Sequence, residues 1–270
     1  MTSLSDSETA GTATTATVAA VVSALRAAGC VFAEDEAELI LATARTPDEL
    51  AAMVDRRAAG QPLEHVLGWA EFHGLRILVE PGVFVPRRRT EFLVDQALAQ
   101  APGASVVVDL CCGSGAVGAA LAAALGDVEL HAADIDPAAV GCARRNIAPY
   151  GGHAHAGDLF GALPAALRGR TGILAANVPY VPSDEVGLLP AEAREHEPLV
   201  ALDGGGDGLD VLRRVAAGAH EWLAPGGCVL VETSERQAEH AVETFQRAGL
   251  TTRLAVSEEL YANVVIGVRA

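Results

Sequence analysis

The feature that most constrains the fold is a regular alternation of short apolar runs with longer segments of helical periodicity, from near residue 90 to the end. The short runs predict strands, and the segments between them, where apolar residues recur every three or four positions, predict helices. Such alternation is typical of a mostly parallel sheet with helices on both faces. The expected strands are Ser105–Leu110, Val128–Ala133, Gly172–Ala176, Cys228–Glu232, Thr251–Val256 and Asn263–Val268. The expected helices are Thr90–Gln100 with Thr90 as N-cap, Ala116–Leu125, Pro137–Ile147, Gly208–Trp222 and Glu235–Ala248.

The expected topology follows from the connections between these segments. Strands separated by a helix are parallel, whereas the last two runs are joined by a short loop and are expected to pair antiparallel. The sequence therefore predicts an α/β protein with a Rossmann-like, doubly wound, seven-stranded, mostly parallel sheet and an antiparallel last strand. In such sheets, ligands bind just outside the carboxyl ends of the strands.

The chain before this sheet has a different character. Residues 1–17 are rich in Ser, Thr and Ala, and we expect a disordered lead there. Residues 18–68 have helical spacing with no strand signal, and Thr46 is the expected N-cap of one helix, so a small all-helical domain is predicted. Residues 69–86 alternate loosely between Gly and Pro breaks, which predicts a β-hairpin linker. Residues 87–270 form the sheet domain.

Charge and cysteine content exclude several functional classes. The 270 residues include 19 Lys and Arg against 35 Asp and Glu, a net charge of −16. This balance is poorly suited to gripping a phosphate backbone. The five Cys show no metal-ligand spacing, and no apolar run approaches the roughly 20 residues of a membrane span. We therefore expect a cytoplasmic protein with no metal, no membrane association and no direct nucleic-acid binding.

A cofactor site is expected around the loop after the first strand of the sheet. Gly113 and Gly115 allow a tight turn close to a ligand, and the loop lacks the Gly and Lys pattern of phosphate-binding loops. Asp109 before this loop therefore suits an amino group better than a pyrophosphate. Asp134, after the next strand, can accept both hydroxyls of a ribose, and Asp158 can meet an adenine amine. The set favours S-adenosylmethionine (SAM), with S-adenosylhomocysteine as product, over a nicotinamide cofactor or ordinary turn residues.

The second signal is Asn177-Val178-Pro179-Tyr180, directly after the expected strand Gly172–Ala176. Methyl transfer from a sulfonium mainly requires a positioned acceptor in an enclosed site. The side-chain oxygen of Asn177 and the carbonyl of Val178 or Pro179 can hold an NH₂ group with its lone pair towards the methyl, while Tyr180 covers a planar face. A turn that merely ends a strand is the competing interpretation. Beside the SAM set, the tetrapeptide predicts N-methylation, with Asn177, Pro179 and Tyr180 as catalytic residues and Val178 as a substrate contact.

The tetrapeptide resembles the N/D/S-P-P-Y/F/W signature of class I amino methyltransferases. More specifically, the chain resembles the HemK/PrmC family of protein-(glutamine) amide N-methyltransferases, which act on peptide chain release factors. The similarity extends to Arg57–Gly68, Phe72–Glu91, Asp109–Gly115 and Glu197–Leu209. It implies methyl transfer from SAM to a release-factor glutamine, with the helical N-terminal domain docking this protein partner.

The resemblance also implies that Pro86, Thr90 and Glu91 line the mouth of the acceptor site. Three departures from the family pattern lie on the acceptor side of the expected site. Val178 replaces the first proline of the signature, Arg89 replaces an acid, and Ser234 replaces the glycine of a Glu-x-Gly-x-x-Gln pattern. The cofactor side is intact, whereas the acceptor side is altered.

Three alternatives remain open at this point. A divergent paralogue would methylate another protein, or a small amine or amide. An RNA adenine methyltransferase also tolerates an aliphatic second residue in its Asn-Leu-Pro-Tyr signature, although the low Lys and Arg content argues against it. A protein that kept the fold and binds SAM without turnover is the non-enzymatic alternative.

Overall fold

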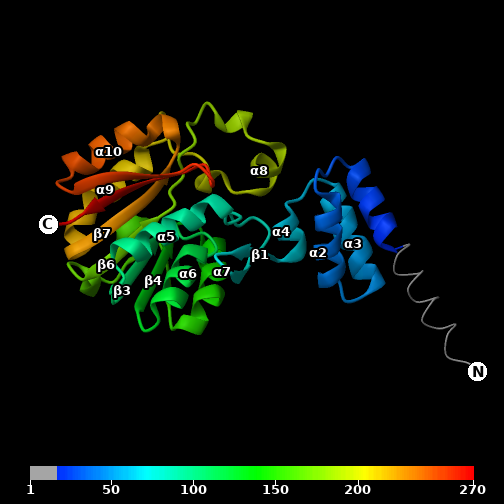
Figure 1. The fold of residues 1–270 in the computed structure, drawn as a ribbon, viewed down its shortest axis with the longest axis horizontal. Helices are drawn as coiled ribbons and strands as arrows, with labels where there is room; N and C mark the ends of the chain where they lie inside the picture. Colours follow the sequence, from blue (N-terminus) through cyan, green and yellow to red (C-terminus); the bar gives the residue numbers. More distant parts are fainter. Residues whose placement is uncertain (1–16) are drawn as a thin grey trace, which may run out of the picture. The chain divides into compact units, whose positions relative to one another are not determined.

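The computed structural model describes residues 17–270, which divide into two compact units (Figure 1). The first unit holds the described residues up to Gly68, together with Ala191–His196. The second holds Trp69–Pro190 and Glu197–Ala270. Of the disordered lead expected over residues 1–17, all but Thr17 lies outside the described residues, and Thr17 is helical.

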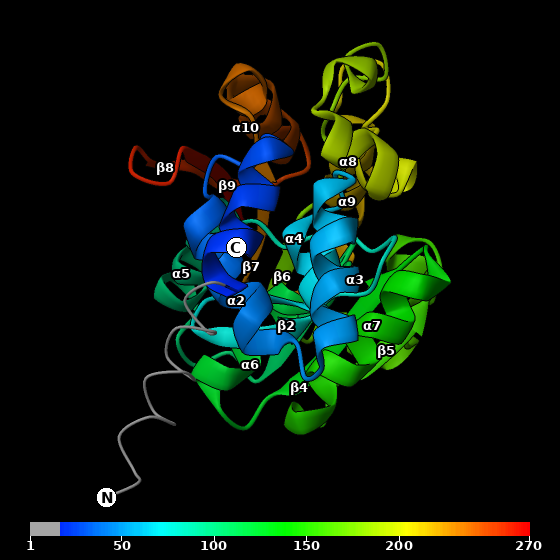
Figure 2. The same cartoon turned by 90° about the vertical axis from the view of Figure 1, so that its right-hand side faces the viewer.

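The first unit consists of helices joined by short turns and loops, and its described residues include no strand. Thr46 caps one helix as expected, because its side chain accepts a hydrogen bond from Glu49 N at 3.1 Å. Leu25, Ile40 and Met53 form the centre of a separate small core. Its helices comprise residues 17–27, α2 (Ala33–Thr43), α3 (Pro47–Ala58), α4 (Leu63–Leu67) and α8 (Ala191–His196), of which α2 and α3 contact each other (Figure 2).

The hairpin is shorter than the sequence predicts and belongs to the second unit. Strand β1 (Trp69–Phe72) pairs antiparallel with β2 (Leu75–Leu78) across a turn in which His73 has φ +49°. Phe72 packs into the core of the second unit. The expected linker continued to residue 86, but the chain is irregular from residue 79, because Pro81 and Gly82 interrupt strand geometry.

A seven-stranded sheet forms the centre of the second unit, which confirms the predicted fold class. The strand order is β5-β4-β3-β6-β7-β9-β8, and every pairing is parallel except those that β9 makes with β7 and β8. The strands are β3 (Val106–Leu110), β4 (Glu129–Asp134), β5 (His153–Ala156), β6 (Thr171–Ala176), β7 (Leu223–Thr233), β8 (Thr251–Ser257) and β9 (Ala262–Val268).

Helices cover both faces of this sheet (Figure 1). Alternate strand residues point to opposite faces, so each strand contributes to two apolar cores. One core includes α5 (Glu91–Gln100), α6 (Ala116–Leu125) and α7 (Pro137–Ile147). The other includes α9 (Asp210–Trp222) and α10 (Ala238–Arg247).

Two expectations about elements need correction. Strand β5, with the sequence His-Ala-His-Ala, was not predicted, because it lacks β-branched residues and gains its strand geometry from pairing with β4. Thr90 was expected to cap α5, but it is itself helical, with φ −70° and ψ −14°, and makes no capping hydrogen bond. It ends a short 3-10 helix, Arg88–Thr90, and its hydroxyl is used elsewhere.

Candidate active site

The order of strands brings four strand ends that carry candidate site residues to one edge of the sheet. Strands β4, β3, β6 and β7 are consecutive neighbours and all parallel. Their carboxyl ends therefore lie side by side, and they carry Asp134, the Gly loop, Asn177 and Glu232 in that order. This is the edge at which doubly wound sheets bind ligands.

The loop between β3 and α6 has an unusual backbone. Cys111, Gly113 and Gly115 have φ values of +53°, +52° and +76°. A Cβ at Gly115 would lie 3.0 Å from both Cα and Cβ of Ala143, so Gly115 is needed both for its φ and for the packing of the loop on α7. Cys111 holds a left-handed conformation without being glycine, which the sequence alone did not indicate.

Asp134 is bound to this loop. Its Oδ2 accepts a hydrogen bond from Gly113 N and its Oδ1 accepts one from Asp136 N, both at 2.9 Å. Burial raises the pKa of this carboxyl above its ordinary value. Each oxygen retains a second lone pair, so the carboxylate can still accept the two hydroxyls of a ribose.

Asp109 has a different environment from the one its sequence position suggested. It is 1% exposed, and its Oδ2 accepts a hydrogen bond from Gly118 N of α6 at 2.8 Å. Burial raises its pKa to about 8. The carboxyl therefore fastens β3 to α6, and its contact with an amino group of SAM stays a prediction.

Asp158 lies at the start of a short 3-10 helix, Leu159–Ala162. Its side chain is half exposed and pairs with Arg214 at 2.6 Å. One carboxylate oxygen makes this contact, so the group retains acceptor capacity for an adenine amine.

Asn177 is half-buried directly after β6. Its Nδ2 donates a long hydrogen bond of 3.4 Å to the hydroxyl of Thr90. Its Oδ1 has no partner among residues 17–270, and this is the atom that an incoming N–H needs. Thr90 therefore orients Asn177. This is a role in addition to the predicted position of Thr90 at the mouth of the site.

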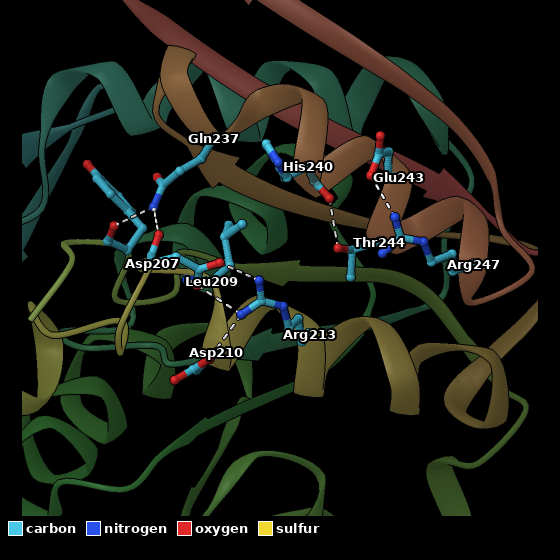
Figure 3. A network of polar contacts seen from close by, with 10 residues as sticks. Asp207, Leu209, Asp210, Arg213, Gln237, His240, Glu243, Thr244 and Arg247 are labelled. Carbon is cyan, nitrogen blue, oxygen red and sulfur yellow. Dashed lines mark hydrogen bonds and ion pairs between the residues drawn. The ribbon is translucent and has the colours of Figure 1, made fainter.

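Hydrogen bonds from the Gln237 side chain fix the backbone of the tetrapeptide Asn177–Tyr180. The Nε2 of Gln237 donates to the carbonyls of Tyr180 and Asp207, both at 2.9 Å (Figure 3). Its Oε1 accepts a hydrogen bond from Ser234 Oγ at 2.6 Å. Val178 and Pro179 are buried. The turn is thus fixed by tertiary hydrogen bonds, although Val178 supplies less stiffness than the family's proline.

Tyr180 is part of a polar cluster that sequence reasoning missed. Arg89 donates hydrogen bonds to the Tyr180 hydroxyl and, from Nε at 2.9 Å, to Glu232 Oε1. The Tyr180 hydroxyl lies 3.5 Å from the same Glu232 oxygen. Burial, with Glu232 nearby, raises the pKa of Tyr180 to about 12, so its phenol is neutral at physiological pH.

Two further residues expected at the mouth have other contacts. Glu91 Oε1 accepts a hydrogen bond from His73 N at 2.9 Å, so its carboxylate fastens the hairpin turn. Pro86 is half-buried beside Arg87, which pairs with buried Glu197 at 2.6 and 2.7 Å. Their contact with a substrate stays a prediction.

The described part of the chain, residues 17–270, contains no group of three or more His, Cys, Asp and Glu side chains arranged to hold a metal ion. Within the same residues, no helix has the length and apolar character needed to cross a membrane.

Comparison with known proteins defines the class. Residues 74–166 match the model of the methyltransferase small domain. The fold resembles the crystal structure of a methyltransferase from Pyrococcus furiosus, with a TM-score of 0.55 at 17% identity over 73% of this chain and 90% of that chain. Together with the strand order, these matches show that the second unit has the fold of a methyltransferase.

Full-length relatives define the family. The chain is 38% identical to the release factor glutamine methyltransferase of Geobacter sulfurreducens, over 83% of this chain and 79% of that protein. It is 37% identical to the enzyme of the same name from Mycolicibacterium smegmatis, over 84% of this chain and 82% of that protein. The protein belongs to the release factor glutamine methyltransferase family, which confirms the resemblance stated above.

Proposed function

We propose that this protein transfers a methyl group from SAM to the side-chain amide nitrogen of a glutamine in a peptide chain release factor. The observation that carries the proposal is Asn177, whose nitrogen is engaged by Thr90 while its Oδ1 has no partner among residues 17–270. Relatives that match most of the chain bear the name of this activity. The helical N-terminal unit is proposed to dock the protein substrate, and the reaction is proposed to take place in the cytoplasm.

The strand-edge residues suit SAM. Bound SAM would supply a methyl group on a sulfonium, which is already a good leaving group. Asp134 has lone pairs for the ribose hydroxyls, Asp158 for the adenine amine, and Gly113 and Gly115 let the backbone approach closely. Asp109 fastens β3 to α6, and it would pair with the amino group of bound SAM, whose positive charge favours the ionised carboxylate.

On the acceptor side, the residues align the amide. Asn177 Oδ1 accepts one N–H, and the carbonyl of Val178 accepts the other. Pro179 is less suited, because its carbonyl lies against the backbone of Gly204, where an added Cβ would be only 2.6 Å away. Tyr180, neutral and fixed by Arg89, covers the planar face. After transfer the methylated nitrogen is acidic and loses a proton readily, so alignment is the main requirement.

The test is transfer of labelled methyl from SAM to a purified release factor with an intact Gly-Gly-Gln loop. Label on that glutamine is expected, and Asn177→Ala should lower turnover at least about a hundredfold with little change in SAM affinity, because only acceptor alignment is lost. A release factor with Ala in place of the glutamine is the substrate control.

The other outcomes separate the remaining alternatives. Label on another protein or a small amide in total lysate would assign the altered acceptor side, with Val178, Arg89 and Ser234, to a different substrate. Label on RNA would support an adenine methyltransferase. SAM binding without any transfer would support the non-catalytic alternative.

A further inference from the structure

Glu232 lies beside Asn177 at the carboxyl edge of the sheet. Strands β6 and β7 pair in parallel, with Ala176 opposite Val231. One step further along each strand, Asn177 adjoins Glu232, and alternation directs both side chains to the same face. This is the face on which Thr90 contacts Asn177 and Arg89 contacts Glu232.

The carboxylate of Glu232 is incompletely satisfied. The residue is 2% exposed, and its Oε2 is buried without a hydrogen-bond partner among residues 17–270. Its Oε1 is engaged by Arg89 at 2.9 Å and lies 3.5 Å from the Tyr180 hydroxyl. A buried carboxylate oxygen without a donor is costly, so such a group in a folded protein calls for an explanation.

Arg89 balances the buried charge of Glu232, and its exposed side chain can also move to let a substrate reach this carboxylate. Its guanidinium balances the charge of Glu232, which keeps the carboxylate suited to accept hydrogen bonds. The Arg89 side chain is 45% exposed, whereas that of Glu232 is 3% exposed. Arg89 is therefore the member of the pair that can shift when a substrate enters.

Only a few hydrogen-bond donors of a protein substrate could reach Glu232. In the proposed acceptor geometry, Asn177 and the Val178 carbonyl take both hydrogens of the glutamine amide. The remaining donors beside the reacting side chain are main-chain N–H groups of the substrate. Glycine neighbours, as in a Gly-Gly-Gln loop, leave these groups unobstructed by side chains.

We propose that Glu232 is a specificity-determining residue, whose free Oε2 accepts a hydrogen bond from a main-chain N–H at or next to the acceptor glutamine. The inference rests on the proposed function and deepens it, because it explains selection of a peptide over a free amide. Arg89 is the positioning residue that holds Glu232 for this contact.

The experiment removes single main-chain donors from the substrate. Release factor is assembled by chemical ligation with an ester in place of one amide, so that the N–H of the acceptor glutamine, or of either neighbour, is absent. We expect one of the three esters to lower kcat/KM of the wild-type enzyme by about tenfold or more, as for a lost hydrogen bond to a charged group. The same ester should cost Glu232→Ala no more than about twofold.

The controls distinguish the possible failures. Thr233→Val alters the neighbouring residue of β7, which faces the opposite side of the sheet and also has an unpartnered buried hydroxyl, so it should keep the full ester penalty. S-adenosylhomocysteine binding and thermal unfolding verify that each variant is folded, and Glu232→Gln provides a same-size variant. Equal ester penalties in wild type and Glu232→Ala, or no penalty in wild type, would overturn the inference while the proposed function stands. No label on the unmodified release factor would overturn the proposed function.

Discussion

Burial in the folded protein changes the ionisation of Asp109. Its carboxyl is buried under α6 and receives one hydrogen bond, from Gly118 N. A charged carboxylate there would lack solvation, so the folded state retains the proton, whereas the unfolded chain releases it at an ordinary pKa. The position therefore links protonation to stability.

The sign of this linkage follows from the two pKa values. Between the unfolded value of 3.8 and the folded value of about 8, the folded protein holds a proton that the unfolded chain has lost. Stability from this group is fully present below the lower value and is lost as pH rises through the upper one. Asp109→Asn, which mimics the protonated carboxyl, should therefore flatten the pH dependence in this window, by up to about 1.4 kcal/mol per pH unit.

Denaturant unfolding of the ligand-free protein from pH 4.5 to 8 measures this difference. Asp158→Asn is a suitable control, because that carboxyl is half exposed. Parallel curves for wild type and Asp109→Asn would show that Asp109 is ionised in the folded protein.

At the scale of elements, the packing of α6 against α7 depends on a glycine between loop and helix. Gly115 combines φ +76° with a space in which a Cβ would be 3.0 Å from Ala143 Cα, a backbone atom. Gly141, inside α7, has ordinary φ and nothing within 4 Å of an added Cβ. The same substitution should thus have opposite effects at the two positions.

Gly115→Ala is expected to destabilise the protein by about 2–4 kcal/mol, since it adds backbone strain to overpacking. Gly141→Ala should stabilise it by about 0.5–1 kcal/mol, because alanine is the better helix former. Chemical denaturation of both variants measures the difference, and similar effects at the two sites would contradict the packing described here.

At the scale of the whole molecule, two units have separate apolar cores. All the proposed SAM contacts lie in the second unit, so ligand binding should stabilise that unit alone. We expect two thermal transitions, of which S-adenosylhomocysteine shifts only the one of the second unit. The gain at a hundredfold excess over Kd is about 2.7 kcal/mol.

Calorimetry with increasing ligand measures the shift, and Asp134→Ala should abolish most of it by removing the ribose contacts. A single transition that moves as a whole with ligand would mean that the two units unfold together.

The sequence was sufficient to predict the fold class, and it also located the strand ends at which the proposed site lies. Asp134 and Asn177 could be found because each directly follows an apolar run, and parallel strands bring their carboxyl ends to a common edge. Strand β5 was missed because its His-Ala-His-Ala sequence carries no intrinsic strand signal and depends on its pairing with β4. Thr90 was assigned to a cap because its position before a helix does not reveal that its hydroxyl meets Asn177.

The sequence by itself determined the alternation of strands and helices, the family, and the residues that are proposed to bear the chemistry, because these depend on local periodicity and short motifs. Only the tertiary structure decided that Glu232 adjoins Asn177, that Arg89 joins Glu232 to Tyr180, and that Gln237 fastens the acceptor turn. These contacts join residues far apart in the chain. They depend on strand register and on burial, which arise only when the whole sheet has formed.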